Sequence, residues 1–197
     1  MIELILIRHT AVEGSRQQRY LGVTDVALNR KGWEQAERIS GYLKNKSIST
    51  IYSSGLKRAY QTATVIAKPY CLKIRKEEGF NEFDFGSWKE KTFYQIQKKY
   101  PNLAQKYLLD PLNTKIPGGE SFRKFKNRVN KVLEQILTKE EGTVVIVSHA
   151  GVNRIIICSL LNLPSSYLWQ IKQDIGAINI IEIYKNMSII SLINHTL

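Results

Sequence analysis

The sequence predicts an α/β fold, a three-layer sandwich in which helices cover both faces of a mostly parallel central sheet. Strand-like and helical patterns alternate along most of the chain. Residues 143–147 are all β-branched, which is typical of a strand buried on both faces of a parallel sheet. The 197 residues suit one well-packed core, and no repeat, low-complexity tract or linker interrupts them. We therefore expect a single domain over residues 1–197.

The first half of the chain alternates regularly between the two patterns. Residues 2–7 form a short apolar run that predicts a buried strand. Apolar side chains then recur at helical spacing over residues 31–44. A brief strand is expected at 50–52, a second helix at 56–66 and another short strand at 71–75.

The second half begins with a polar and aromatic stretch and then returns to the same alternation. The expected elements are, in order, short helices at 92–99 and 102–109, a turn at 117–119, a long amphipathic helix at 122–136, the strand at 143–147, a helix from Gly151 to about Leu161, and closing strands at 177–184 and 187–193.

The composition is that of a globular protein, with 43% hydrophobic and 23% charged residues, and it excludes a disordered chain. The apolar run at 2–7 is too short for a signal peptide, and no stretch approaches the roughly 20 apolar residues of a membrane span. Cys71 and Cys158 lie in apolar surroundings and indicate neither a disulfide framework nor a zinc site. We expect a cytoplasmic protein with no membrane partner.

The formal net charge of +12 is the one unusual bulk property. The basic residues are spread along the whole chain, without a dense run and without regularly interleaved aromatic residues. A lysine-rich solvated surface is the preferred explanation, followed by a general attraction for phosphorylated substrates. We expect no specific nucleic-acid partner. The oligomeric state is left open, with a homodimer as one option.

Two of the three histidines directly follow strands that are expected to be parallel. His9 comes after the strand at 2–7, and His149 after the strand at 143–147. Ligands of open α/β sheets bind in the crevice beyond the carboxyl ends of the strands, so these two side chains are candidates for one pocket. A single histidine is more often structural, and His195, near the C-terminus, is interpreted in that way.

Arg8 and His9 form a pair that suits phosphoryl transfer. An arginine fork holds phosphate through two hydrogen bonds, and a neutral imidazole nitrogen can attack phosphorus. Cationic neighbours disfavour protonation of His9 and so keep it nucleophilic. Arg58, in the first turn of the helix at 56–66, is the candidate second clamp. Taken alone, this segment would favour an exposed helix arginine instead.

Four segments, in this order, resemble the histidine phosphatase superfamily, which includes the cofactor-dependent phosphoglycerate mutases. They are residues 6–10 with the arginine-histidine pair, 22–28 with Gly32 and residues 35–36, 53–63 with the second arginine, and 147–151 with the second histidine. The resemblance covers nearly the whole chain. It implies a phosphoglycerate mutase-like fold, a nucleophilic His9, and phosphate contacts from Arg8, Arg58 and His149. Ser15, Gly22 and Ala150 are the further phosphate-binding positions that we take from it.

The breaking phosphoester needs a proton donor, because an alkoxide is a poor leaving group. Acidic residues gather around the segment 80–88, and the residues alone do not choose among Glu77, Glu78, Glu82, Asp84 and Glu90. The resemblance places the donor at Glu82. Its expected neighbours Phe83, Phe85 and Trp88 are apolar, and such surroundings favour a protonated carboxyl group.

These assignments predict a two-step phosphatase that needs no metal and no cofactor. His9 attacks phosphorus while Glu82 protonates the leaving oxygen, and Glu82 then activates the water that hydrolyses the phosphohistidine. The resemblance has departures at Thr10, where glycine is usual, at Ser15, near a usual asparagine, and at residues 89–90. These departures and the short chain favour a phosphatase over a mutase.

Residues 8–10, 20–28 and 117–121 look most like the α-ribazole phosphatase branch of that superfamily. This likeness implies a small-molecule phosphomonoester substrate, α-ribazole 5′-phosphate or the corresponding cobalamin phosphate, in assembly of the cobalamin nucleotide loop. Tyr20, Phe83, Trp88 and Tyr107 are candidates for the apolar walls around a flat base. Two alternatives remain open: a broad sugar-phosphate phosphatase or mutase on the same scaffold, and a noncatalytic module that binds phosphate or nucleic acid.

Overall fold

The computed structural model describes residues 1–197, apart from the side chain of Arg16. Its centre is a six-stranded sheet with the strand order β3-β2-β4-β1-β5-β6. The strands are β1 (Ile2–Arg8), β2 (Ile48–Ser54), β3 (Ile74–Glu77), β4 (Gly142–Ser148), β5 (Ile178–Ile183) and β6 (Ser188–His195). Strand β5 runs antiparallel to both of its neighbours, whereas β1, β2, β3 and β4 pair in parallel. The predicted mostly parallel sheet is confirmed.

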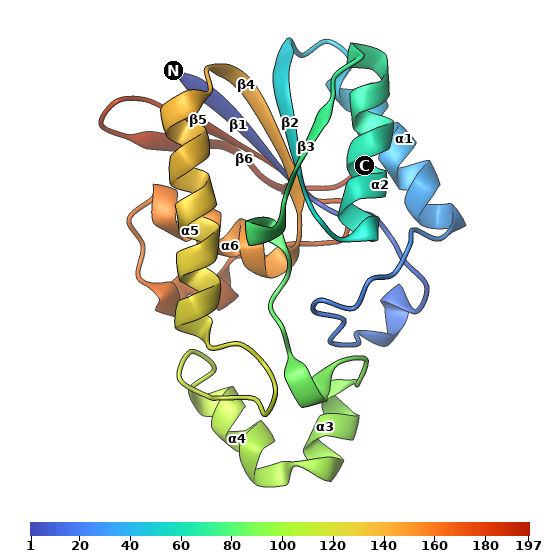
Figure 1. Ribbon diagram of the computed structural model, residues 1–197, viewed down its shortest axis with the longest axis vertical. Coiled ribbons are helices and arrows are strands. Elements are labelled where there is room, and N and C mark those ends of the chain that lie inside the picture. Colours follow the sequence, from blue (N-terminus) through green and yellow to red (C-terminus); the bar gives the residue numbers. More distant parts are fainter.

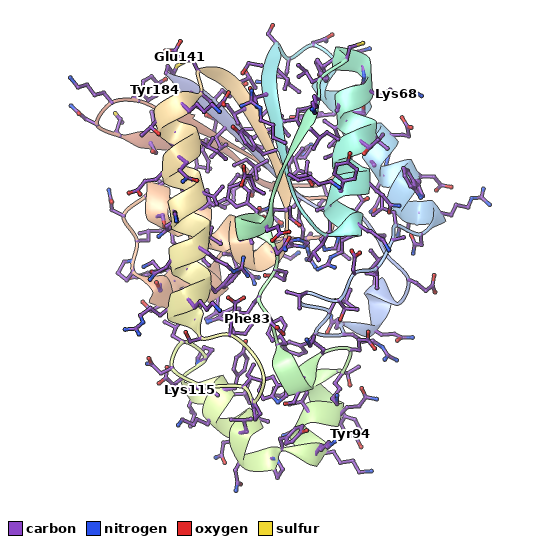
Figure 2. The ribbon with its side chains drawn as sticks, in the orientation of Figure 1. Lys68, Phe83, Tyr94, Lys115, Glu141 and Tyr184 are labelled. Carbon is purple, nitrogen blue, oxygen red and sulfur yellow. The ribbon has the colours of Figure 1, made fainter. Side chains whose placement is uncertain are left out.

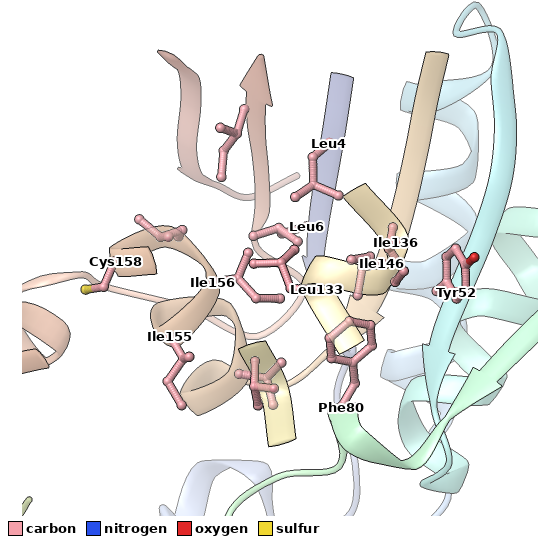
Figure 3. Packing of buried hydrophobic residues seen from close by; sticks show 14 of the residues in the cluster. Leu4, Leu6, Tyr52, Phe80, Leu133, Ile136, Ile146, Ile155, Ile156 and Cys158 are labelled. Atoms are coloured by element: carbon pink, nitrogen blue, oxygen red, sulfur yellow. The ribbon is translucent and has the colours of Figure 1, made fainter. Parts of the chain in front are cut away.

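Helices cover the two faces of this sheet (Figure 1). Helices α1 (Arg30–Leu43) and α2 (Lys57–Ala67) pack on one face, and α5 (Phe122–Lys139) and α6 (Ala150–Leu160) on the other. Side chains of β1 alternate between the two layers, because successive residues of a strand point to opposite faces. Leu4 and Leu6 join the α5–α6 core drawn in Figure 3, and Ile5 and Ile7 join the α1–α2 core.

Helices α3 (Phe93–Lys99) and α4 (Pro101–Leu109) lie beyond the carboxyl end of the sheet, at the bottom of Figure 1. They enclose a small apolar cluster built around the completely buried indole of Trp88. Phe83 lies where this part meets the rest of the domain, and Tyr94 lies on its outer side (Figure 2). Short 3-10 helices complete the chain: η1 (Ser15–Gln17), η2 (Lys68–Tyr70), η3 (Glu78–Phe80), η4 (Gly86–Trp88) and η5 (Ser165–Gln170).

The third strand is displaced from its predicted position. It begins at Ile74, because Lys68–Tyr70 forms a 3-10 turn that ends at Cys71 in a left-handed conformation with φ of 53°. That backbone conformation cannot continue into a strand, so the predicted strand at 71–75 is wrong in its first residues. Cys71 is also exposed, contrary to the expected apolar surroundings, whereas Cys158 is buried.

No helix in the part of the chain described here is long and apolar enough to cross a bilayer.

Candidate active site

The two histidines are adjacent because their strands are adjacent. Arg8, the last residue of β1, pairs in register with Ser148, the last residue of β4. The His9 backbone N–H donates to the Ser148 carbonyl oxygen at 2.8 Å. The rings of His9 and His149 follow directly, with their centroids 5.2 Å apart. Parallel pairing of two strands therefore brings together two side chains that are 140 positions apart in the sequence.

The surroundings of His9 keep it neutral and leave one ring nitrogen free. Its Nδ1 lies 2.8 Å from the Thr10 carbonyl oxygen, which can only accept, so Nδ1 carries the hydrogen. Burial, then the charges of Arg58 and Arg8, hold the pKa of His9 well below 6.5, although the bond to Thr10 opposes the shift. The Nε2 atom consequently holds an unshared electron pair at neutral pH.

Arg58 is completely buried, so the expectation of a clamp fits better than that of an exposed helix arginine. Its Nη1 donates to the Thr24 carbonyl oxygen at 2.7 Å and its Nη2 to that of Gly22 at 2.6 Å. Burial lowers the pKa of Arg58 to about 10, with Glu82 opposing the shift and Arg8 adding to it. The guanidinium therefore keeps its charge at neutral pH.

Arg8 and Arg58 each retain one buried donor that no described atom accepts. These donors are the two Nε–H groups; Arg8 Nη1 is engaged by the Gln173 carbonyl oxygen at 2.6 Å. Burial is the main cause that lowers the pKa of Arg8. A buried unpaired donor costs about 1–3 kcal/mol, so an anion between the two arginines would relieve this cost.

His149 is completely buried and lies behind His9, outside the wall of the cleft. Its Nε2 lies 2.7 Å from Ser54 Oγ, which also accepts from the Leu56 backbone N–H at 3.1 Å. Its Nδ1 is buried and, among the residues described, meets no partner. Burial first, then the proximity of Arg58, His9, Arg8 and Arg128, holds the pKa of His149 well below 6.5.

The Glu82 carboxylate rests on the first turn of α6. Its Oε2 accepts from the Gly151 backbone N–H at 3.1 Å, and its Oε1 from its own neighbour Phe83 at 2.9 Å. A Cβ atom at position 151 would lie only 2.4 Å from Oε1, so this approach requires glycine.

Arg128 on α5, which sequence reasoning missed, holds the backbone on which Glu82 stands. Its guanidinium donates to the carbonyl oxygens of Gly79 at 2.9 Å, Asn81 at 2.6 Å and Glu82 at 2.9 Å. It also forms an ion pair with Glu120 at 2.7 Å. Its sequence context, a helix rich in exposed basic residues, contains no signal that separates it from its neighbours.

A cleft of about 970 Å³ lies at the carboxyl edge of the sheet. The sequence-predicted residues in its wall are Arg8, His9, Ser15, Gly22, Arg58, Glu82 and Ala150. The aromatic residues in its wall are Tyr20, Phe83, Phe85, Phe93, Tyr107, Phe122, Phe125 and Trp169. One expectation needs correction, because Trp88 is not in the wall but is buried beneath Tyr20 and Tyr107.

The Ser15 hydroxyl is hydrogen-bonded to the backbone of Val12 at 2.6 and 2.8 Å, and its contact with phosphate stays a prediction.

Within the described residues, no group of three or more His, Cys, Asp and Glu side chains is arranged to hold a metal ion.

The fold and the cleft define an α/β protein with a cationic, histidine-containing pocket at the carboxyl edge of its sheet. The chain belongs to the histidine phosphatase superfamily (branch 1), whose family model matches residues 4–196. Membership supports phosphatase activity.

Individual relatives agree with this assignment. Phosphoserine phosphatase 1 of Hydrogenobacter thermophilus is 33% identical over 197 residues, which cover 100% of this chain and 93% of the relative. The adenosylcobalamin/α-ribazole phosphatase of Escherichia coli is 24% identical over 98% of this chain and 96% of its own. The crystal structure of the α-ribazole phosphatase from Shigella flexneri matches with a TM-score of 0.91 and 25% identity, covering 98% of this chain and 96% of that chain. The phosphoglycerate mutase-like fold is confirmed.

Proposed function

We propose that the chain hydrolyses phosphomonoesters through a phosphohistidine formed on His9, without a metal ion. The observation that carries the proposal is the free Nε2 electron pair of a buried, neutral His9 next to two arginines that each keep an unused donor. Nucleophile and anion clamp occur together in one cleft, and pure binding of phosphate would need only the clamp.

In the first step, Arg8 and Arg58 hold the phosphoryl oxygens and His9 Nε2 attacks phosphorus. The bond between phosphorus and the leaving oxygen breaks, and Glu82 in its protonated form supplies the proton to that oxygen. The guanidinium charges offset the negative charge on the transferring group, which is the role that a metal ion has in other phosphoryl-transfer sites. Metal independence is part of the proposal for this reason.

The family resemblance also implies a phosphate contact from His149. When the Ser54 hydroxyl donates to Nε2, the hydrogen of the neutral ring lies on Nδ1, the nitrogen that lacks a partner among the described atoms. Because this N–H is buried outside the cleft wall, its contact with a phosphoryl oxygen requires that it become accessible when the substrate binds. The Ala150 backbone N–H at the start of α6 adds a further donor and the favourable end of the helix dipole.

In the second step, Glu82 removes a proton from water as the water attacks phosphorus. The bond from phosphorus to Nε2 breaks, inorganic phosphate leaves, and His9 regains its electron pair with Nδ1–H unchanged. Glu82 is protonated again and ready for the next cycle. The chemistry balances without an oxidant, a reductant or a cofactor.

Two substrates are supported by separate observations. The aromatic wall and the resemblance at residues 8–10, 20–28 and 117–121 favour α-ribazole 5′-phosphate or its cobalamin conjugate. The higher identity to the Hydrogenobacter enzyme favours phosphoserine. The test is a substrate panel assayed in the presence of EDTA, with both compounds, 3-phosphoglycerate, sugar phosphates and p-nitrophenyl phosphate. It distinguishes an enzyme specific for either compound from a mutase or a broad phosphatase.

The test of the mechanism is capture of the phosphoenzyme. Rapid quenching with a labelled substrate should give a phosphoprotein that is labile in acid and stable in alkali. His9→Ala should lose the phosphoprotein and at least about 10³-fold in kcat. His195→Ala, a histidine that packs near Tyr42 away from the cleft, is the control and should retain both. Full activity in His9→Ala would refute the proposal, and absence of all hydrolysis with salt-sensitive nucleic-acid binding would favour a binding module.

A further inference from the structure

Besides Arg8 and Arg58, the guanidinium group of Arg154 lines the same cleft, and the proposed mechanism does not use it. Arg154 stands one turn beyond Ala150 and Gly151 on α6, so all three residues share the helix face that borders the cleft. Its side chain is largely desolvated, and burial lowers its pKa while Glu82 and Tyr107 oppose the shift.

The guanidinium group of Arg154 is held through its Nε atom and by an aromatic ring, whereas its two terminal nitrogens make no hydrogen bond to the described residues. Its Nε donates to the Ile171 carbonyl oxygen at 2.8 Å, and its guanidinium carbon lies 5.5 Å from the ring centroid of Trp169. Among the described residues, Arg154 has no carboxylate within ion-pair distance, and neither terminal nitrogen makes a hydrogen bond to the protein. A rigid guanidinium edge of this kind suits two parallel bonds to a carboxylate.

Arg154 has no paired anion among the described residues of the cleft, so a second negative charge on the substrate would be favourable beside it. A phosphate dianion matches Arg8 and Arg58. Glu82 must be protonated to act as the acid, so it cannot balance Arg154 in the first step. Asp174, also in the wall, is already paired with Lys172 at 2.8 Å. Among the described side chains, the remaining cation in the wall is Arg19, which is exposed to solvent, where water screens its charge.

We propose that Arg154 is a specificity-determining residue that binds a carboxylate on the leaving group. The inference rests on the proposed function and narrows its substrate class to phosphate esters of short hydroxy or amino acids. In the proposed mechanism the leaving oxygen meets Glu82, whose carboxylate accepts from the Gly151 backbone N–H, and Arg154 stands one turn beyond Gly151 on α6. We therefore expect a leaving group of two or three carbons that ends in a carboxylate to span the two positions. The Trp169 ring packs against the guanidinium group.

The test uses two substrates that differ only by the carboxylate, O-phospho-L-serine and O-phosphoethanolamine. The wild-type protein should prefer phosphoserine in kcat/KM by about 10- to 100-fold, the size expected for a charge-assisted pair. Arg154→Gln should remove most of this preference by slowing phosphoserine alone, with phosphoethanolamine and p-nitrophenyl phosphate changed less than about threefold. Arg154→Lys should restore only part of the preference, since lysine lacks the fork. Arg123→Gln, an exposed arginine on α5 outside the cleft, is the charge-matched control and should keep the wild-type ratio.

Two results would overturn the inference. Equal losses on all three substrates in Arg154→Gln would make this residue a phosphate ligand or a structural support. A wild-type protein that hydrolyses α-ribazole 5′-phosphate as fast as phosphoserine would also contradict it. Trp169→Leu, at a half-exposed position, should also reduce the ratio of kcat/KM for phosphoserine to that for phosphoethanolamine. This variant tests the inference if the Arg154 variants fold poorly. Failure of the proposed function gives a different result, namely no phosphoenzyme and no turnover of any ester.

Discussion

Gly151→Ala should separate catalysis from stability, because one added methyl group meets the proposed acid. The new Cβ would lie 2.4 Å from Glu82 Oε1, whereas ordinary contacts begin at 3.4 Å. The Phe125 ring, 3.2 Å from the same Cβ, prevents the methyl group from moving away. The end of a flexible side chain yields more easily than a helix or a packed ring, so the carboxylate should retreat by about 1 Å, the difference between the two distances.

A displacement of this size can reduce a rate by about 10²-fold when the group takes part in the chemical step. The loss should appear in kcat for alkyl phosphates, whose leaving oxygen needs the proton. It should be much smaller for p-nitrophenyl phosphate, whose leaving group, p-nitrophenolate, is a stable anion without a proton. The free energy of unfolding should stay within about 1 kcal/mol of wild type, since alanine favours the helix by that order and the displaced contact offsets the gain.

The measurements are steady-state kinetics on the two ester types and urea unfolding. Gly41→Ala in α1 is the matched control, because its Cβ would meet nothing within 4 Å. It should gain about 0.5–1 kcal/mol and leave both rates unchanged. Wild-type kcat for alkyl phosphates in Gly151→Ala, or an equal loss for both ester types, would show that Glu82 in this position is not the proton donor.

Three further outcomes follow from the contacts of the site. Arg128→Gln should lower the free energy of unfolding by about 2 kcal/mol and reduce kcat for alkyl esters, because the backbone that carries Glu82 loses its clamp; unchanged urea midpoints would contradict this. Gly22→Ala should cost at least about 1–2 kcal/mol, since φ is +51° and the added Cβ would lie 2.5 Å from a backbone carbonyl oxygen. Because folding depresses the pKa values of His9 and His149, the unfolded chain takes up protons first as the pH falls below 6.5. The free energy of unfolding should therefore decrease from pH 6.5 downward, by up to about 1.4 kcal/mol per pH unit for each histidine, and a flat profile between pH 5 and 6.5 would refute the buried neutral state.

The sequence predicted that His9 and His149 lie together, because local patterns and sheet geometry suffice for that step. An apolar or β-branched run followed directly by a histidine places that histidine at the carboxyl edge, and parallel pairing of β1 with β4 then joins His9 to His149. Glu82 is a different case. It follows no strand pattern, and several nearby carboxylates share its composition, so only the family resemblance selected it.

The parts that sequence reasoning missed depend on tertiary packing. Arg128 occupies a helix on which most other basic residues face solvent, whereas Arg154 is the single basic residue of α6. In neither case does helical periodicity tell an arginine that lines or supports the site from a solvated one. Trp88 was expected in the cleft wall because it lies near Glu82 in the sequence. The structure buries it under helices α3 and α4, since a side chain of that size stabilises this small cluster most when it is fully enclosed.

Burial of the site explains both the depressed pKa values of its histidines and the cost of its unpaired arginine donors. Removing water depresses the pKa values of His9 and His149 and keeps both rings neutral, while the arginines, whose ordinary pKa is far higher, keep their charge under the same conditions. A neutral nucleophile and permanent cations can therefore coexist only a few ångströms apart. The same desolvation makes the unpaired Nε–H groups of Arg8 and Arg58 unfavourable until an anion accepts from them. The proposed affinity for phosphate and the proposed nucleophilicity of the imidazole would thus both follow from burial of the cleft floor, and a change that admits water should weaken both together.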